Sequence, residues 1–376
     1  MSTPFAALVD QRSVIVCCGT GGVGKTTTAA AIALAAARRG RRVVVVTVDP
    51  AKRLADALGV GQLTNEPQLV ATFESDAPHA PGELWATMLD TKRTFDDLVT
   101  RHAADDGQRR RILANAFYRN ISGTLSGTQE YMAAEKLYEL HADERFDLVV
   151  VDTPPTRNAL DVLDAPERLA NFLDHRLYRT LMAPTRLYLK AANLAAQAFM
   201  RAVSKVVGGE VIADAIAFFQ AFDGMEQGFR ERATAARALL GATDTAFVVI
   251  ASPRADTVAE ATWFTAQLEA RSTPAAALVV NRAHPRFTSL AAHEARRRAR
   301  SSRSARTRAR WTNLAELTEV ADAEDAVIAP LHVAMAPAPT VVVALRATDL
   351  HDLAALESLA DDLLAPQPGA ASLTDS

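Results

Sequence analysis

A glycine-rich segment near the beginning of the chain contains the residue types that bind phosphate groups. Residues 19–27 read GTGGVGKTT and fit the pattern G-x-x-x-x-G-K-[ST]. The segment follows a short apolar run, expected to be a buried strand, and opens an alanine-rich stretch expected to be a helix. Backbone amides at such a turn, together with the positive end of the helix, stabilise a bound di- or triphosphate. The alternative is a glycine-rich turn without a ligand, but the motif and its context together favour phosphate binding.

The residue types in this loop predict a site for ATP and Mg²⁺. Lys25 is expected to reach the β- and γ-phosphates, and the Thr26 hydroxyl is expected to ligate the magnesium ion. The remaining loop residues surround the phosphates with their backbone amides. The predicted nucleotide-binding residues of the loop are Gly21, Gly22, Val23, Gly24, Lys25, Thr26 and Thr27.

Further polar residues end predicted strands, where ligands bind in open parallel sheets. Asp152 ends the run FDLVVVD and is expected to hold magnesium through a water, although many such aspartates only cap a helix. Asp49 follows the second strand, where a carboxylate can orient or deprotonate an attacking water. Its alternative role is to cap a helix before Pro50. Asn281 ends LVVNR, where its amide can contact adenine or bond to the backbone of its own turn.

Short runs rich in Val and Ile, separated by helical stretches, predict the scaffold. The runs are apolar on both faces, as in a parallel sheet that helices cover on each side. A helix over 26–40 joins the first two and ends in Arg38, Arg39 and Gly40, which suit a helix C-terminus. The predicted strands are 14–18, 43–48, 84–89, 148–151, 247–251, 277–280 and 327–333. The expected fold class is α/β, a doubly wound and mostly parallel sheet of the P-loop type with a helical insertion.

The chain is predicted to form a single domain over 1–365, followed by a Pro-, Ala- and Ser-rich disordered tail over 366–376. Helical segments at about 90–143 and 164–240 are expected to form a subdomain within it. Residues 188–206 and 211–222 carry wide apolar helical faces. These faces either bind an apolar client or partner, or pack against each other.

Composition limits the classes of partner. The net charge of −3 gives no general attraction to nucleic acid, which is therefore not an expected partner. The chain has no signal-peptide pattern and no apolar run of membrane-spanning length, so we expect a cytoplasmic protein, with membrane association at most transient. The stretch 294–310 is strongly basic. It is either a solvated loop or helix face, or a surface for anionic lipid or nucleic acid.

Four segments resemble the nucleotide motifs of the ArsA family, which comprises ATPase subunits of arsenite pumps and ATPases that target tail-anchored membrane proteins. They are GTGGVGKTT, TVDPAKRLADAL at 47–58, DTPPTRNALDVL at 152–163 and VVNR at 279–282. The resemblance implies that Asp49 positions the hydrolytic water in switch I, that 152–158 is switch II and that Asn281 contacts adenine. It also implies a dimer that opens and closes with hydrolysis, and a helical region for clients.

The sequence departs from the family pattern at several positions. Family loops usually have a lysine, which reaches the partner's nucleotide, where this chain has Thr20. Hydrolysis by a homodimer is therefore in question, and a heterodimer with a related ATPase subunit becomes an alternative. Lys52 or Arg53 are other cations that could substitute. Arg157 and Asn158 replace the usual Gly-His of switch II.

The cysteines separate this chain from part of the family it resembles. Cys17 and Cys18 are adjacent and are the only cysteines, so neither separated metalloid ligands nor a C-x-x-C pair is present. Core packing is their expected role.

The expected function is Mg²⁺-dependent ATP hydrolysis that drives a dimer in membrane-protein targeting or chaperoning, with apolar client segments or an integral membrane protein as partner. The alternatives are an energising ATPase subunit of a membrane transport complex, without cysteine-bound arsenite, and a weakly catalytic regulatory subunit of a heterodimer.

Overall fold

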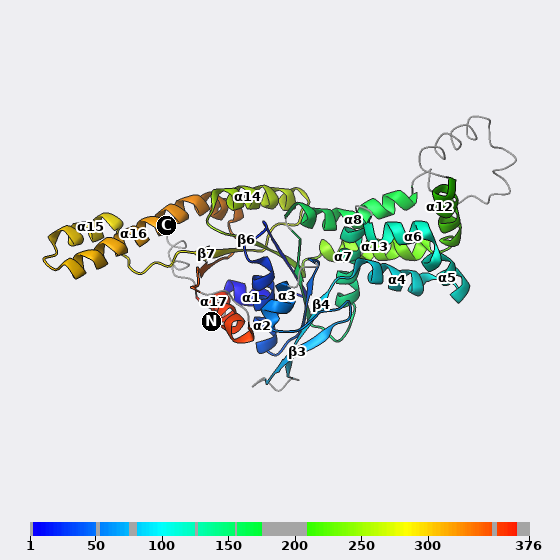
Figure 1. Cartoon of the computed structure of the whole chain (residues 1–376), viewed down its shortest axis with the longest axis horizontal. Helices are drawn as coiled ribbons and strands as arrows, with labels where there is room; N and C mark the ends of the chain where they lie inside the picture. The colour runs from blue at the N-terminus through cyan, green and yellow to red at the C-terminus, as the bar shows by residue number, and fades with distance from the viewer. Residues whose placement is uncertain are drawn as a thin grey trace, which may run out of the picture. The chain divides into compact units, whose positions relative to one another are not determined.

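The structure is a computed structural model that describes residues 3–49, 53–74, 81–124, 127–154, 156–174, 209–347 and 352–366 (Figure 1). The chain divides into two compact units. Unit 1 comprises residues 1–88, 143–160 and 243–376, and unit 2 comprises 89–142 and 161–242. The predicted helix over 188–206 and residues 367–376 of the predicted tail lie outside the described residues.

An eight-stranded sheet forms the centre of unit 1, in the order β3-β4-β2-β5-β1-β6-β7-β8. All neighbouring strands are parallel except β3 and β4, which pair antiparallel. The strands are β1 (Val14–Gly19), β2 (Arg42–Thr47), β3 (Gln68–Phe73), β4 (Gly82–Met88), β5 (Leu148–Asp152), β6 (Thr245–Ala251), β7 (Ala277–Ala283) and β8 (Thr340–Ala344). This arrangement confirms the predicted α/β class with a mostly parallel sheet.

Helices cover both faces of the sheet, as the doubly wound class requires (Figure 1). α1 (Pro4–Gln11), α2 (Lys25–Arg38), α3 (Arg53–Leu58) and α17 (Leu353–Leu364) share one apolar core with one face. α14 (Ala255–Ala270) and α16 (Ala305–Met335) lie against β6 and β7 on the other. The buried alanines of α2 let this helix lie close to the central strands, and Gly40, at φ 90°, ends the helical segment as predicted.

Unit 2 is helical, and aromatic side chains form its core. Its helices are α4 (Thr91–His102), α5 (Asp106–Ala114), α6 (Ala116–Thr124), α7 (Thr128–His141), most of α8 (Thr156–Asp174), α12 (Gly209–Ala221) and α13 (Glu226–Leu240). Phe218 of α12 and Phe222, directly after this helix, are buried against each other and against Tyr118 and Phe229. These phenylalanines of the predicted apolar face therefore pack inside the unit. None of the described helices combines the length and apolarity needed to cross a bilayer.

The prediction of a strand over 327–333 is wrong, because these residues belong to α16. Ile328, Leu331 and Met335 are buried at helical spacing, whereas Val333 is 78% exposed. The last strand is instead β8, whose alternating burial is typical of an edge strand. The other edge strand, β3, also carries exposed side chains. A search of the sequence for runs that are apolar on both faces therefore misses both edge strands.

Candidate functional site

The glycine-rich loop leaves the central strand β1 and enters α2, so the positive end of this helix faces the loop. Gly22 and Gly24 have φ of 82° and 95°, in the left-handed region that favours glycine. Gly21 and Gly22 are exposed, whereas Val23 is buried and anchors the loop in the core. The loop thus presents its backbone outward, as the predicted phosphate cradle requires.

Gly24 is a loop position that tolerates a side chain poorly. A Cβ there would lie 2.3 Å from Nδ2 of Asn281, in addition to the strain of its positive φ. We expect Gly24→Ala to lower the free energy of unfolding by about 1–2 kcal/mol and to weaken ATP binding. Urea unfolding checks the first effect. Gly21→Ala is the control for stability, because its Cβ would meet nothing within 4 Å. Equal stability of the two variants would contradict the expectation.

Lys25 lies in the first turn of α2 and is 8% exposed. Its Nζ donates a hydrogen bond to the Thr20 carbonyl at 3.0 Å, so the ammonium folds back under the loop. Burial lowers the pKa of Lys25, while the carboxylates of Asp152 and Asp49 oppose this change. The side chain is a buried cation held beside the loop, where an incoming phosphate would find it.

Asp152 ends β5 and is 1% exposed. Its Oδ2 accepts hydrogen bonds from the hydroxyls of Thr26 at 2.8 Å and Thr47 at 2.9 Å. The strand register explains this meeting, since Asp152 pairs with Thr47 of β2 and with Cys17 of β1. Sequence reasoning missed Thr47, although its position at the end of the second strand was a usable signal. Burial raises the pKa of Asp152, and the two hydroxyls and Lys25 oppose it.

The donor set around Asp152 fits a magnesium ion. Its other oxygen, Oδ1, is buried without a hydrogen-bond partner among the described residues. Leaving a buried carboxylate oxygen unpaired is costly, so a ligand is expected there. Mg²⁺ prefers oxygen ligands, often one or two from the protein, and the Thr26 hydroxyl lies against the same carboxylate. These two residues would hold the metal; Thr27 follows, half-buried, in the first turn of α2.

Asp49 follows β2 and is half-buried. Its carboxylate lies 3.6 Å from Nη1 of Arg53, and its backbone N–H donates to the Thr47 hydroxyl at 3.2 Å. Asp49 is thereby linked through Thr47 to Asp152, so the structure brings both predicted carboxylates to one edge of the sheet. Lys52, a predicted substitute cation, lies outside the described residues, as do the side chains of Arg157 and Asn158.

Asn281 and Arg282 hold the loop from the end of β7. The Asn281 amide donates to the Val23 carbonyl at 2.8 Å, and its oxygen accepts from the Arg282 N–H at 2.9 Å. Arg282 adopts φ 63°, and its Nη1 donates to the Gly22 carbonyl at 3.0 Å. In this structure the Asn281 amide therefore ties the end of β7 to the glycine-rich loop, and its contact with adenine stays a prediction. Arg282 was not predicted from the sequence, because neither its charge nor its position after Asn281 is enough to identify it as a residue of the site.

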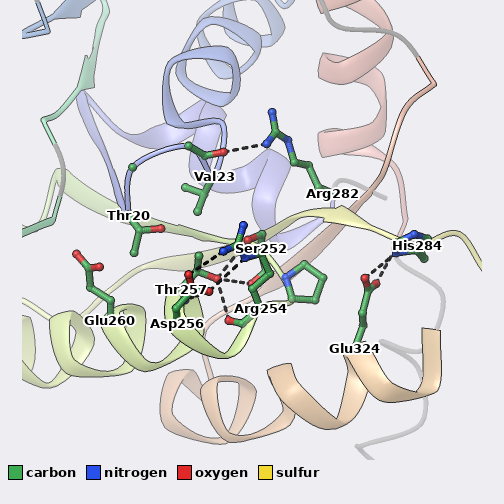
Figure 2. A pocket seen from close by; sticks show the side chains of 13 residues that line it. Thr20, Val23, Ser252, Arg254, Asp256, Thr257, Glu260, Arg282, His284 and Glu324 are labelled. Atoms are coloured by element: carbon green, nitrogen blue, oxygen red, sulfur yellow. Dashed lines mark hydrogen bonds and ion pairs between the residues drawn. The ribbon is translucent and has the colours of Figure 1, made fainter. Parts of the chain in front are cut away.

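A cavity of about 640 Å³ lies along one side of the loop (Figure 2). Its walls come from the loop, the segment between β6 and α14, the end of β7 and Glu324 of α16. Polar pairs line it, including the ion pair of Arg254 with Asp256 at 2.9 Å and the hydrogen-bonded pair of His284 with Glu324 at 2.6 Å. Thr20 faces this cavity, and its hydroxyl is buried without a partner in the described part of the chain.

Cys17 and Cys18 are both free and buried in β1, which confirms their predicted place in the core. Burial raises the pKa of Cys18 to about 12, and that of Cys17 well above its usual value. Both thiols are thus held in the protonated form, which is a poor metal ligand. Within the described residues, no group of three or more His, Cys, Asp and Glu side chains is placed to hold a metal.

The parallel sheet, the glycine-rich loop after its central strand and the Lys25–Thr26–Asp152 cluster define a P-loop protein. Residues 12–315 match the sequence model of the ArsA family, described as anion-transporting ATPases. The chain therefore belongs to this family, which confirms the resemblance seen in its motifs.

Curated relatives match a part of the chain. The ATPase ASNA1 homolog of Babesia bovis is 33% identical over 175 residues, 45% of this chain and 44% of the relative. The ATPase GET3 of Malassezia globosa is 30% identical over 170 residues, 44% and 46% of the two chains. A putative arsenical pump-driving ATPase of Halobacterium salinarum is 29% identical over 179 residues, 44% of this chain and 26% of the relative. The matches span less than half the length of these relatives.

Proposed function

We propose that this chain binds ATP with Mg²⁺ and hydrolyses it. The observation that carries the proposal is the cluster of buried Lys25, half-buried Thr26 and buried Asp152 directly beneath an outward-facing glycine-rich loop. A cation, a hydroxyl and a carboxylate with an unpaired buried oxygen are the groups that phosphate and its metal require. The family membership of the chain supports the same assignment.

Each residue of the site has a distinct role in the proposed reaction. The loop amides and Lys25 bind the phosphates, and Lys25 exchanges the Thr20 carbonyl for a phosphate oxygen. Mg²⁺, when bound by Thr26 and Asp152, neutralises charge on the phosphates. Asp49 orients the attacking water and accepts its proton. Contact between Asn281 and adenine requires its amide to give up Val23, which frees the loop carbonyl.

The role of Asp49 is tested by Asp49→Asn. We expect turnover to fall by about 10²–10⁴-fold while ATP affinity is retained, because the amide cannot accept the proton of the water. Steady-state hydrolysis and equilibrium ATP binding measure the two quantities. The control is Asp56→Asn, the same change at an exposed position of α3, which should leave both unchanged. Full turnover by Asp49→Asn would overturn the assigned role.

A second candidate is a weakly catalytic subunit of a heterodimer, and Thr20 favours it. The family's usual lysine is replaced by an uncharged side chain whose hydroxyl has no partner among the described residues. Arg53, a predicted substitute for the missing cation, is exposed and lies against Asp49. In this second candidate, a partner subunit supplies the missing cation across the dimer. Tight ATP binding without turnover by the isolated chain, together with turnover restored by a related subunit, is the result that this candidate predicts.

We further propose that ATP hydrolysis switches a dimer that serves membrane-protein targeting or chaperoning from the cytoplasm. Support comes from the family and from the GET3 and ASNA1 names of its relatives. The buried phenylalanines of α12 offer no exposed client surface. Nucleotide-dependent capture of a tail-anchored segment would support the proposal. Co-purification with one integral membrane protein, without capture, would favour a transport-complex subunit instead.

A further inference from the structure

The basic stretch of the sequence forms one end of a helical hairpin in unit 1. α15 (Ala292–Ser301) packs antiparallel on the first half of α16 through small buried residues, among them Ala295, Ala299 and Ala315. Arg296 clamps the two helices by a bidentate pair with Glu319, at 2.7 and 2.6 Å. The hairpin projects from the sheet of unit 1, with its turn at the far end (Figure 1).

Arginines of this hairpin fall into two groups. Those in the middle of α15 build the hairpin: Arg296 pairs with Glu319, and Arg297 and Arg298 pair with Glu294. The second group surrounds the turn, is exposed and forms no ion pair with any described carboxylate. We call it the basic tip, and it consists of Arg300, Arg303, Arg306, Arg308 and Arg310.

The arginines of the basic tip that lie in α16 oppose the stability of the start of that helix. Arg306 and Arg308 lie in the first turns of α16, which has no acidic residue in its first turn, so they face the positive end of the helix dipole. Arg306 and Arg310 are also a like-charged pair one turn apart, which is destabilising. An anionic partner would remove both penalties. Arg300 suits the last turn of α15, and Arg308 donates a hydrogen bond to the Ser302 carbonyl at 3.1 Å. The remaining positive charge at the start of α16 is better explained by binding than by folding.

Geometry narrows the choice of anionic partner. Two helices side by side, each about 10–12 Å across, exceed the roughly 12 Å width of a DNA major groove. Single-stranded nucleic acid needs free aromatic rings to stack on, but Trp311 is covered by the Arg298 guanidinium at 5.1 Å. Arg306 and Arg310 share one face of α16, whereas Arg308 points to another side, so the arginines of this helix do not all lie on one face that could match an acidic protein surface. A flat surface that meets the turn of the hairpin end-on can contact arginines that point in different directions.

We propose that the basic tip docks end-on to an anionic lipid bilayer surface. Guanidinium groups bind lipid phosphates and carboxylates through paired hydrogen bonds. The structure shows no exposed large apolar side chain between 288 and 316, so the contact is electrostatic and does not insert into the bilayer. The rest of the chain is acidic, because the whole carries −3 although the hairpin end is strongly positive. The projecting hairpin keeps the sheet of unit 1 away from the membrane.

The test uses the full chain and sedimentation with phosphatidylcholine vesicles, with and without phosphatidylserine. Wild-type protein should bind only the anionic vesicles, and binding should weaken steeply as salt is added. Arg303→Gln/Arg306→Gln should reduce the partition coefficient about 25-fold, from about five-fold for each arginine. The control is Arg111→Gln/Arg119→Gln, which removes the same charge from exposed positions of α5 and α6. It should leave binding nearly unchanged.

Several outcomes would overturn the proposal. Equal binding to neutral and anionic vesicles would show that charge is not the cause, and an equal loss in the control would show that net charge, not the tip, is responsible. Absence of vesicle binding by wild-type protein would exclude the bilayer. Binding of a duplex or single-stranded oligonucleotide at salt concentrations that release the vesicles would assign the basic tip to nucleic acid instead. Circular dichroism of both variants establishes that the helices are retained.

Discussion

Lys25→Met is expected to reduce kcat/KM for ATP by about 10³-fold without unfolding the protein. The ammonium is the only charge that the loop itself brings to the phosphates, and removing one such electrostatic contact typically costs two to three orders of magnitude. Burial lowers the pKa of Lys25, which means that the folded protein disfavours the charged form. Methionine keeps the aliphatic packing and removes this cost, so the free energy of unfolding should stay the same or rise.

Two measurements on Lys25→Met separate function from folding. Hydrolysis assays give kcat/KM, and urea unfolding without nucleotide gives stability. ATP should raise the unfolding midpoint of the wild-type protein and not that of the variant, because only a ligand that binds the native state stabilises it. If the variant retained both turnover and stabilisation by ATP, Lys25 would not be part of the nucleotide site.

Arg232→Ala is expected to destabilise unit 2 by about 3–5 kcal/mol, the usual cost of leaving a buried charge without its partner. Glu135 of α7 is 1% exposed, and its Oε1 accepts a hydrogen bond from Nε of Arg232 in α13. Arg101 of α4 lies 3.9 Å from the same oxygen, so the carboxylate ties three helices together. Arg232 also lies over the Tyr138 ring at 4.9 Å. Loss of the guanidinium removes the only hydrogen bond to this carboxylate that the described residues show and leaves Arg101, at 3.9 Å, as its nearest cation.

The double variant Glu135→Leu/Arg232→Met is the matched control. It removes both charges and keeps the volume, so its stability should lie close to that of wild type. Urea unfolding of the single and double variants gives the comparison. A double variant as unstable as Arg232→Ala would show that packing, not the stranded charge, causes the loss.

The ion pair of Glu135 and Arg232 makes the stability of the protein depend on pH. Burial raises the pKa of Glu135, and Arg232 and Arg101 oppose this rise, while Glu139 adds to it. Because the folded pKa lies above the unfolded one, the contribution of Glu135 to stability is present below the unfolded pKa and is lost as pH rises through the folded pKa. Removal of Arg232 raises the folded pKa further. The stability deficit of Arg232→Ala should therefore shrink in acid.

The sequence was sufficient to predict the inner strands of the sheet but not its edge strands. Inner strands such as β1 and β6 are buried on both faces, and uninterrupted runs of Val, Ile and Cys reveal them. β8 shows alternation instead, and the run over 327–333 has apolar residues that fit a strand or a helix equally well. Pro330 adds a signal against a helix interior, yet it lies inside α16. Tertiary packing of Leu331 and Met335 decides the outcome.

In the candidate site, residues within a motif were predictable and residues that meet through the register were not. Lys25, Thr26 and Asp152 follow from local patterns, and the structure brings them together. Thr47 reaches Asp152 only because β2 and β5 are neighbours in the sheet, although β3 and β4 separate them along the chain. Arg282 meets the loop across an even longer separation. Such contacts depend on strand order, which no local pattern specifies.

Magnesium-dependent ATP turnover by the purified chain alone is the decisive test of ATP hydrolysis at the glycine-rich loop. We expect that ATP is hydrolysed when Mg²⁺ is present, that chelation of the metal abolishes turnover, and that Lys25→Met lowers it to background. ATP binding without turnover would contradict hydrolysis by the isolated chain and would assign the missing cation at Thr20 to another subunit. Failure to bind ATP, or turnover unchanged in Lys25→Met, would contradict the assignment of the loop as the nucleotide site.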